Sequence, residues 1–396
     1  MRTATRIPRW RLPIAVVAVA TLLVVAVITL AEGDVPYAVR VLSRGDANTS
    51  DYTWKATQRI VADSPVAWRE HDECAQVTAA FSGVGVPSMN EYLAEGAAQS
   101  LVVIHHGQLV CQWYGNGGAA DRPAMAFSVS KSVLALLVAR AVDARLMNLD
   151  DPITAYVPEL GERDPRFAEI TIRALLDMRS GIGFSQQVDF PWVNQDASAV
   201  YYSSDLVETV LTRPQIVSPP GPFQYNDYAP NLVGLALQRA TGTTLTDGPV
   251  SDLWHAIGAQ DDAWWCVDGH GFAWHESGLV STARDLARIG QLYLDEGLVS
   301  GDLVAPSAYI TTGLSGSHAD PVVDFGGIPM GYENGWWRLP GPSGGADLAA
   351  MGNFGQVMVV SPASDVVIVR LGTDEVRESN ASIAARLALV ADALSK

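Results

Sequence analysis

Two pairs of short apolar runs, one early and one late in the chain, predict β-hairpins. Residues 101–104 and 109–113 are rich in Val, Leu, Ile and Trp and are separated by a four-residue segment that includes Gly107. Residues 356–360 and 366–369 flank a second turn, made of Pro, Ala, Ser and Asp. We expect one antiparallel sheet built from N- and C-terminal segments.

Helix-type patterns fill the rest of the chain. The segment after Ser128 is apolar almost all round, which predicts a buried helix. Further helices are predicted at residues 171–178, 231–240, 281–297 and 379–394. The combination predicts an α+β fold, in which helices flank the sheet and a helical region is inserted into the chain.

The N-terminus carries a different signal. Residues 12–31 contain no charged side chain, follow four arginines, and precede Glu32 and Asp34. This length and charge asymmetry predict a transmembrane anchor, with residues 1–11 in the cytoplasm and the rest exported. A cleaved signal peptide, which would release a secreted protein, is the alternative. Residues 32–95 are predicted to be a linker and a peripheral segment, and residues 96–396 the main domain.

Composition and residue spacing limit which ligands and partners the protein is expected to bind. The net charge of −17 argues against a nucleic-acid-binding protein, which needs a basic surface. Cys74, Cys111 and Cys266 allow one disulfide in an exported protein, but their spacing does not select the pair. No group of residues has metal-ligand spacing, so neither a metal nor a cofactor is predicted.

The strongest chemical signal is Ser128-Val129-Ser130-Lys131. Only three of the 26 basic residues are lysines: Lys55, Lys131 and Lys396. Ser128 and Lys131 lie three positions apart and share a helix face. Burial lowers the pKa of a lysine, and the neutral amine then accepts the proton of a neighbouring hydroxyl.

Several motifs in order resemble the β-lactamase-related serine hydrolases, the superfamily of class C β-lactamases and penicillin-binding proteins. The likeness covers about residues 96–375 and is greatest to the branch of 6-aminohexanoate-oligomer hydrolases and esterases. The motifs occupy residues 127–132, 149–153, 156–160, 175–182, 223–227, 232–234, 283–290 and 352–356.

The resemblance implies a β-lactamase/transpeptidase-like fold and a division of roles. Ser128 would be the nucleophile that forms an acyl-enzyme, Lys131 the base, and Tyr225 the proton relay to the leaving group. The backbone N–H groups of Ser128 and Asn353 would form the oxyanion hole.

The remaining site residues match the family pattern less closely. Asp227 replaces the usual asparagine of Tyr-x-Asn, and its charge favours the protonated form of Lys131. The third motif falls at Ala350-Met351-Gly352 and lacks the cation with which penicillin-recognising members hold a carboxylate. Asp227, Gly352, Gly355 and Gln356 are the predicted substrate-binding residues. The loop with His270, Trp274, His275 and Glu276 lies near the site in the family, although solvated loop side chains are the more frequent outcome.

These observations predict a membrane-anchored, extracytoplasmic serine hydrolase. Its substrate would be a small or short oligomeric amide or ester, cleaved through an acyl-serine intermediate. A carboxylesterase, or a D-alanyl-D-alanine peptidase or β-lactamase, is the alternative among enzymes. A non-catalytic envelope binding protein with the same fold is the alternative outside them.

Overall fold

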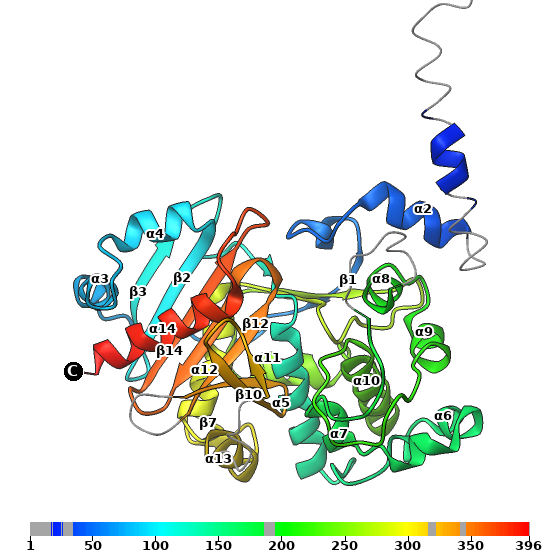
Figure 1. The fold of residues 1–396 in the computed structure, drawn as a ribbon. Coiled ribbons are helices and arrows are strands. Elements are labelled where there is room, and N and C mark those ends of the chain that lie inside the picture. Colours follow the sequence, from blue (N-terminus) through cyan, green and yellow to red (C-terminus); the bar gives the residue numbers. More distant parts are fainter. Residues whose placement is uncertain are drawn as a thin grey trace, which may run out of the picture.

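The computed structural model describes residues 35–185, 195–315, 322–340 and 346–395, together with a few positions between 17 and 26. Its centre is an eight-stranded antiparallel sheet in the order β3-β2-β14-β13-β12-β11-β10-β9 (Figure 1). The strands are β2 (Ala98–His105), β3 (Gln108–Tyr114), β9 (Val323–Asp324), β10 (Pro329–Glu333), β11 (Trp336–Pro340), β12 (Ala346–Gly352), β13 (Gln356–Ser361) and β14 (Val366–Gly372).

The sheet joins distant parts of the chain. Both predicted hairpins form, as β2–β3 and β13–β14. The two hairpins pair with each other through β2 and β14, where Ile104 lies opposite Val367. The α+β fold, with a sheet built from N- and C-terminal segments, is therefore confirmed.

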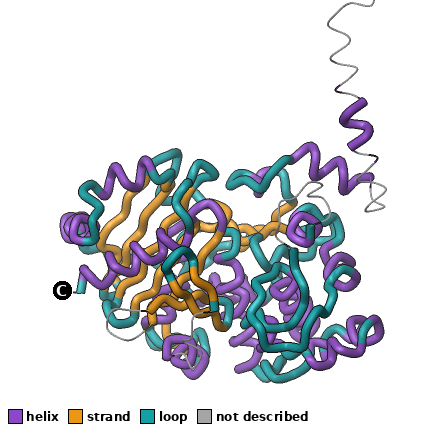
Figure 2. Tube along the Cα trace, viewed as in Figure 1, coloured by secondary structure: helices purple, strands orange, loops and turns teal. Residues whose placement is uncertain are grey.

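Helices cover both faces of this sheet (Figures 1 and 2). On one face, α14 (Asn380–Leu394) packs on β12 and β13 and against α3 (Cys74–Gly83), while α4 (Met89–Glu95) packs on β2. On the other face, α5 (Val129–Asp143) and α12 (Ala283–Leu294) contact β13.

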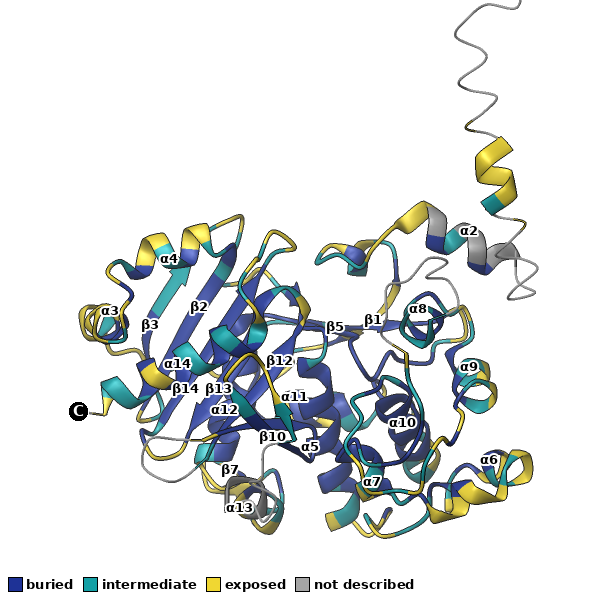
Figure 3. Ribbon diagram, in the orientation of Figure 1, coloured by how far each residue is buried: buried dark blue, intermediate teal, exposed yellow. Residues whose placement is uncertain are grey.

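The inserted helical region lies beside the sheet. Its helices are α6 (Pro158–Arg163), α7 (Ile172–Leu176), α8 (Asp196–Tyr201), α9 (Leu206–Thr212), α10 (Tyr228–Thr241) and α11 (Pro249–Ala256). Helix α10 contacts both α5 and α7, and most residues of α5 and α10 are buried (Figure 3). Helix α13 (Ser307–Ser315) packs near β12.

A second, four-stranded sheet has the order β1-β5-β6-β4. It consists of β1 (Ala56–Ile60), β4 (Ala124–Met125), β5 (Ala263–Val267) and β6 (Leu279–Ser281). The hairpin β7 (Leu298–Val299) and β8 (Asp302–Leu303) stands apart. Because β4 and β6 flank the segment that leads into α5, this small sheet fixes the start of that helix.

Residues 32–95, expected to be a linker and a peripheral segment, are integrated into the fold from residue 35 onward. We call residues 35–60, which hold α2 (Val35–Arg44) and β1, the N-terminal arm. Strand β1 pairs along its whole length with β5, and a disulfide joins Cys74 to Cys111 of β3. The third cysteine, Cys266, is a buried free thiol.

The predicted anchor at residues 12–31 falls mostly outside the described residues. Among the residues that the structure does describe, no helix has the length and apolar character needed to cross a bilayer.

Candidate active site

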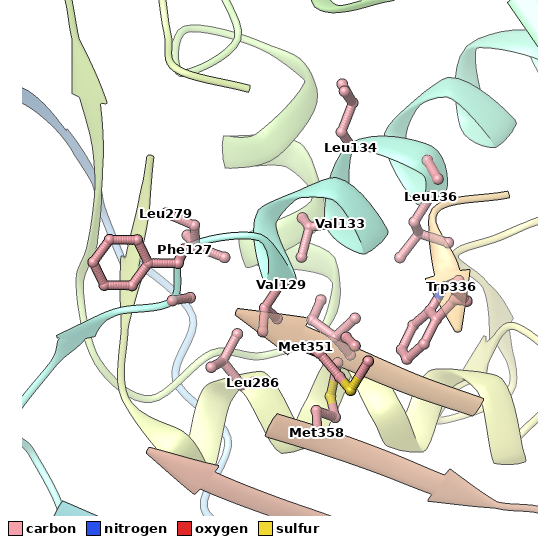
Figure 4. Close-up of a cluster of buried hydrophobic side chains, with 14 of the residues drawn as sticks. Phe127, Val129, Val133, Leu134, Leu136, Leu279, Leu286, Trp336, Met351 and Met358 are labelled. Atoms are coloured by element: carbon pink, nitrogen blue, oxygen red, sulfur yellow. The ribbon is translucent and has the colours of Figure 1, made fainter. Parts of the chain in front are cut away.

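The first turn of α5 carries Ser128 and Lys131 and is held rigidly. Figure 4 shows Val129 and Val133 of α5 packed toward Met351 and Met358 of the sheet. The two serines between these valines anchor the turn by hydrogen bonds. Ser130 Oγ accepts from the N–H of Leu279 at 3.0 Å, and Ser132 Oγ donates to Gly335 O at 2.7 Å. Packing and hydrogen bonds therefore hold Ser128, the candidate nucleophile, in a defined position.

Lys131 lies at the centre of the site. Its side chain is only 3% exposed, and its Nζ contacts three oxygens. These are Ser128 Oγ at 2.7 Å, Asp227 Oδ1 at 2.9 Å and the main-chain oxygen of Glu276 at 3.0 Å. The spacing of Ser128 and Lys131 thus produces the contact expected from the sequence.

The charge state of Lys131 differs from the sequence expectation. Burial lowers the pKa of the amine, as predicted, but the negative charge of Asp227 and the neighbouring Tyr225 raise it, and the net result is a pKa above the ordinary value. The direction of this pKa shift is opposite to the lowering expected for a lysine base, and the charge of Asp227 acts in the direction expected from the sequence. Lys131 is an ammonium ion paired with Asp227.

Tyr225 lies beside Lys131 in an aromatic cluster. The ammonium sits 4.9 Å from the centre of the Tyr225 ring, which stacks on Trp337 and meets Tyr332 edge-on. Within the described part of the chain, the Tyr225 hydroxyl makes no hydrogen bond in this resting state. The structure thus brings the tyrosine to the site, with its ring face rather than its hydroxyl against the lysine.

The end of β12 reaches the nucleophile. A Cβ at Gly352 would lie 2.2 Å from Ala126 O and 3.1 Å from Ser128 N, so only glycine permits this approach. Asn353 follows and lines the same pocket as Ser128. Phe354, with φ of 64°, turns the chain away and packs edge-on against Phe127. This arrangement is compatible with the predicted oxyanion hole.

Two predicted substrate-binding residues have structural roles instead. A Cβ at Gly355 would meet the guanidinium of Arg370, whose Nη1 donates to Gly355 O at 2.6 Å. Gln356 is fully buried, and its amide exchanges hydrogen bonds with the backbone of Gly372 at 3.0 and 3.1 Å. Neither residue lines the pocket, because the motif turns into the core immediately after Asn353.

The pocket above Ser128 has a volume of about 300 Å³. Asp227, Glu276 and Asn353 line it near the nucleophile. The N-terminal arm (residues 45–47) and the α8 segment (residues 195–202) form its outer wall. No Lys, Arg or His side chain lines it among the described residues, which agrees with the missing cation at Ala350.

Glu276 is the part of the near-site loop that reaches the chemistry. Its carboxyl is buried; Oε1 accepts from Ser277 Oγ at 2.9 Å, and Oε2 has no hydrogen-bond partner among the described residues. Burial, followed by the charge of Asp227, raises the pKa of Glu276 to about 7. His275 is fully buried, and burial lowers its pKa to about 3, so it is neutral; His270 is exposed near Asp205.

Lys55, which sequence reasoning left without a role, supports the outer wall. Its buried Nζ donates to Tyr201 O at 2.8 Å and lies 3.7 Å from the centre of the Trp274 ring. Asp51 accepts from the Tyr201 hydroxyl at 2.6 Å. The rarity of lysine in the sequence could have marked Lys55 as a residue of interest, but it did not indicate which residues Lys55 contacts.

The chain is similar to known proteins over most of its length. The family model described as "Beta-lactamase" matches residues 86–393. The 6-aminohexanoate-dimer hydrolase of Paenarthrobacter ureafaciens is 28% identical over 300 residues, which cover 73% of this chain and 76% of that protein. The esterase EstB of Burkholderia gladioli is 27% identical over 218 residues, 48% of this chain and 52% of that protein.

Solved structures show the same fold. A Bacillus anthracis protein proposed to be a 6-aminohexanoate-dimer hydrolase superposes with a TM-score of 0.76 at 22% identity, covering 87% of this chain and 92% of that one. A penicillin-binding protein homologue from Caulobacter crescentus gives 0.62 at 17% identity, covering 83% and 98%. The resemblance and fold predicted from the motifs are thus confirmed: the chain belongs to the beta-lactamase family and is a serine hydrolase.

Proposed function

We propose that the protein cleaves an amide or ester bond through an acyl intermediate on Ser128. The observation that carries the proposal is the 2.7 Å contact between Lys131 Nζ and Ser128 Oγ at the base of a pocket. A hydroxyl is a poor nucleophile unless a nearby base takes its proton, and this contact supplies the route for that proton.

The reaction would proceed in two halves. Ser128 Oγ attacks the substrate carbonyl, and the resulting oxyanion binds the N–H groups of Ser128 and Asn353. The tetrahedral intermediate then expels the amine or alcohol, which receives a proton through Tyr225. Water attacks the acyl-enzyme in the second half and frees the acid.

The lining of the pocket favours a linear amide or ester over a β-lactam. The described lining has carboxyl groups from Asp227 and Glu276 but no cation to hold the carboxylate of a penicillin or a D-alanyl peptide. The names of two relatives, an aminohexanoate-dimer hydrolase and an esterase, point in the same direction. We therefore rank amidase or esterase activity above peptidase or β-lactamase activity.

An extracytoplasmic location, with residues 12–31 as the membrane anchor, is part of the proposal. The Cys74–Cys111 disulfide supports export, because such bonds persist in oxidising compartments. Fractionation of cells that express the full chain tests the anchor. The protein should appear with the membranes and be released by detergent but not by high salt.

The first test of function is active-site labelling. A fluorophosphonate probe should label the wild type and leave Ser128→Ala unlabelled, because the probe reacts with activated serines. Persistent labelling of Ser128→Ala would show that another residue is the nucleophile. No labelling of the wild type would favour the non-catalytic binding protein.

A substrate panel separates the subclasses. We expect turnover of p-nitrophenyl esters or a linear aminohexanoate dimer to exceed that of nitrocefin and a D-alanyl-D-alanine peptide by at least about tenfold in kcat/KM. The reverse order would refute the ranking without affecting the nucleophile.

A further inference from the structure

The ammonium of Lys131 has no capacity left to act as a base. An ammonium group offers three N–H donors and no acceptor. Lys131 directs them at Ser128 Oγ, Asp227 Oδ1 and Glu276 O, at 2.7, 2.9 and 3.0 Å. To take the proton of Ser128, the amine must first lose one of its own, so the site needs an acceptor for that proton.

Three groups that can exchange a proton face Lys131, each from a different element. Asp227 lies at the start of α10, Tyr225 in the segment before it, and Glu276 in the segment before β6. Tyr225 presents its ring to the ammonium, and Glu276 presents its main-chain oxygen. Asp227 alone among the three directs a carboxylate oxygen at Nζ.

Asp227 is also open to the pocket. Its side chain is 23% exposed and lines the pocket. It makes no capping hydrogen bond to α10, because Asn226 Oδ1 accepts from the N–H of Ala229 at 2.8 Å and takes that role. Within the part of the chain that the structure describes, the one side-chain contact of this carboxylate in the network is the ion pair with Lys131.

We propose that Asp227 is the proton acceptor of Lys131, and that the Lys131–Asp227 pair, rather than the lysine alone, activates Ser128. This inference rests on the proposed function. Asp227 acts through the lysine and is a positioning residue in this sense, since it does not contact the reacting carbonyl.

The steps balance without any further reactant. One Nζ–H proton passes to Asp227 Oδ1, which leaves a neutral amine and a carboxylic acid. The amine accepts the proton of Ser128 as Oγ bonds to the substrate carbonyl carbon. When the tetrahedral intermediate collapses, the ammonium supplies a proton to the leaving nitrogen or oxygen. Asp227 then returns its proton to the amine.

The pair makes a distinctive prediction about pH. The proton passes from Lys131 to Asp227 and is not released to solvent. The active form of the enzyme is therefore the Lys131–Asp227 ion pair, which already exists at neutral pH. The acylation rate, measured as the burst of p-nitrophenol from an ester, should be flat between pH 8 and 10 in the wild type. A lysine that acts alone would have to lose its proton to solvent, and the rate would then rise about tenfold per pH unit over this range.

Asp227→Asn provides the complementary test. The amide keeps the shape but cannot accept the proton, so acylation at pH 7 should fall about a hundredfold or more and should become dependent on base. Asp227→Glu should restore part of the rate and the flat profile. If Asp227 merely holds the lysine protonated, Asp227→Asn should acylate faster than the wild type, and that result would overturn the inference.

A matched control uses the same substitution at another ion pair. Asp150→Asn breaks the exposed contact with Arg173 and should leave the burst unchanged. If Asp227→Asn fails to fold, the pH dependence of the wild-type acylation rate between pH 8 and 10 still tests whether the pair or the lysine alone activates Ser128. A wild type that neither reacts with the fluorophosphonate probe nor releases p-nitrophenol refutes the proposed function and this inference together. A burst whose rate rises with pH refutes the inference alone.

Discussion

At the scale of single residues, the pocket concentrates buried groups whose charges depend on one another. Lys131, Asp227 and Glu276 form a continuous group, and Lys55 of the N-terminal arm interacts electrostatically with both Glu276 and Asp51. Charges in such surroundings interact strongly because little water screens them. A substitution that changes one charge should therefore shift the titration of the others.

Glu276 gives this coupling a measurable effect on stability. Its pKa rises from an ordinary value of 4.5 to about 7 on folding. Between those values the folded protein holds more protons than the unfolded chain, so its stability decreases as the pH rises. Glu276→Gln lacks this contribution. The urea midpoint of Glu276→Gln minus that of the wild type should therefore be larger at pH 8 than at pH 5.

The exposed Glu95 supplies the control for this comparison. The difference in urea midpoint between Glu95→Gln and the wild type should be the same at pH 5 and at pH 8. If the urea midpoints of Glu276→Gln and the wild type change by the same amount between pH 5 and pH 8, the raised pKa assigned to Glu276 is contradicted.

Gly352 tests the approach of the strand to the nucleophile. Gly352→Ala places a methyl group against Ala126 O and Ser128 N, so β12 must move away. A displacement of about 1 Å in a catalytic arrangement costs about a hundredfold in rate, and we expect that loss in the p-nitrophenol burst. Gly83→Ala, at a position with open space, should retain full activity. An active Gly352→Ala would exclude the proposed oxyanion hole.

At the scale of elements, the sequence predicted what is encoded locally. The hairpins β2–β3 and β13–β14 and the buried helix α5 follow from residues that are neighbours in the chain. The contact of Lys131 with Ser128 follows from one turn of helix. Asn353 and Tyr225 could be placed only through the family resemblance, because they reach Ser128 from distant segments.

The remaining features depend on tertiary approach. Nothing in the pattern around Glu276 indicates that the loop folds its carboxyl into the pocket. The choice of Cys74 and Cys111 over Cys266 arises because α3 packs next to β3, whereas Cys266 lies inside the small sheet. The N-terminal arm became part of the pocket wall through contacts with Tyr201 that no local rule predicts.

The disulfide should stabilise the edge of the main sheet. It closes a loop with a sequence separation of 37 residues, for which loop entropy predicts about 4 kcal/mol. The double variant Cys74→Ala/Cys111→Ala should lose up to that amount in urea unfolding. Its acylation rate at 25 °C should be unchanged, because the bond joins α3 to β3 and no residue of these two elements lines the pocket. A change in the acylation rate would show that the edge of the sheet is coupled to the site.

At the scale of the whole molecule, the pairing of β2 with β14 has a consequence for how the protein is made. Residue 104 has to find residue 367 before the centre of the sheet exists. Contacts between such distant positions slow folding, and the early strands remain exposed until synthesis is nearly complete. The partner surface for α5 also includes β12 and β13. The nucleophile can therefore take its working position only after the last strands leave the ribosome, so a nascent chain should be inert until then.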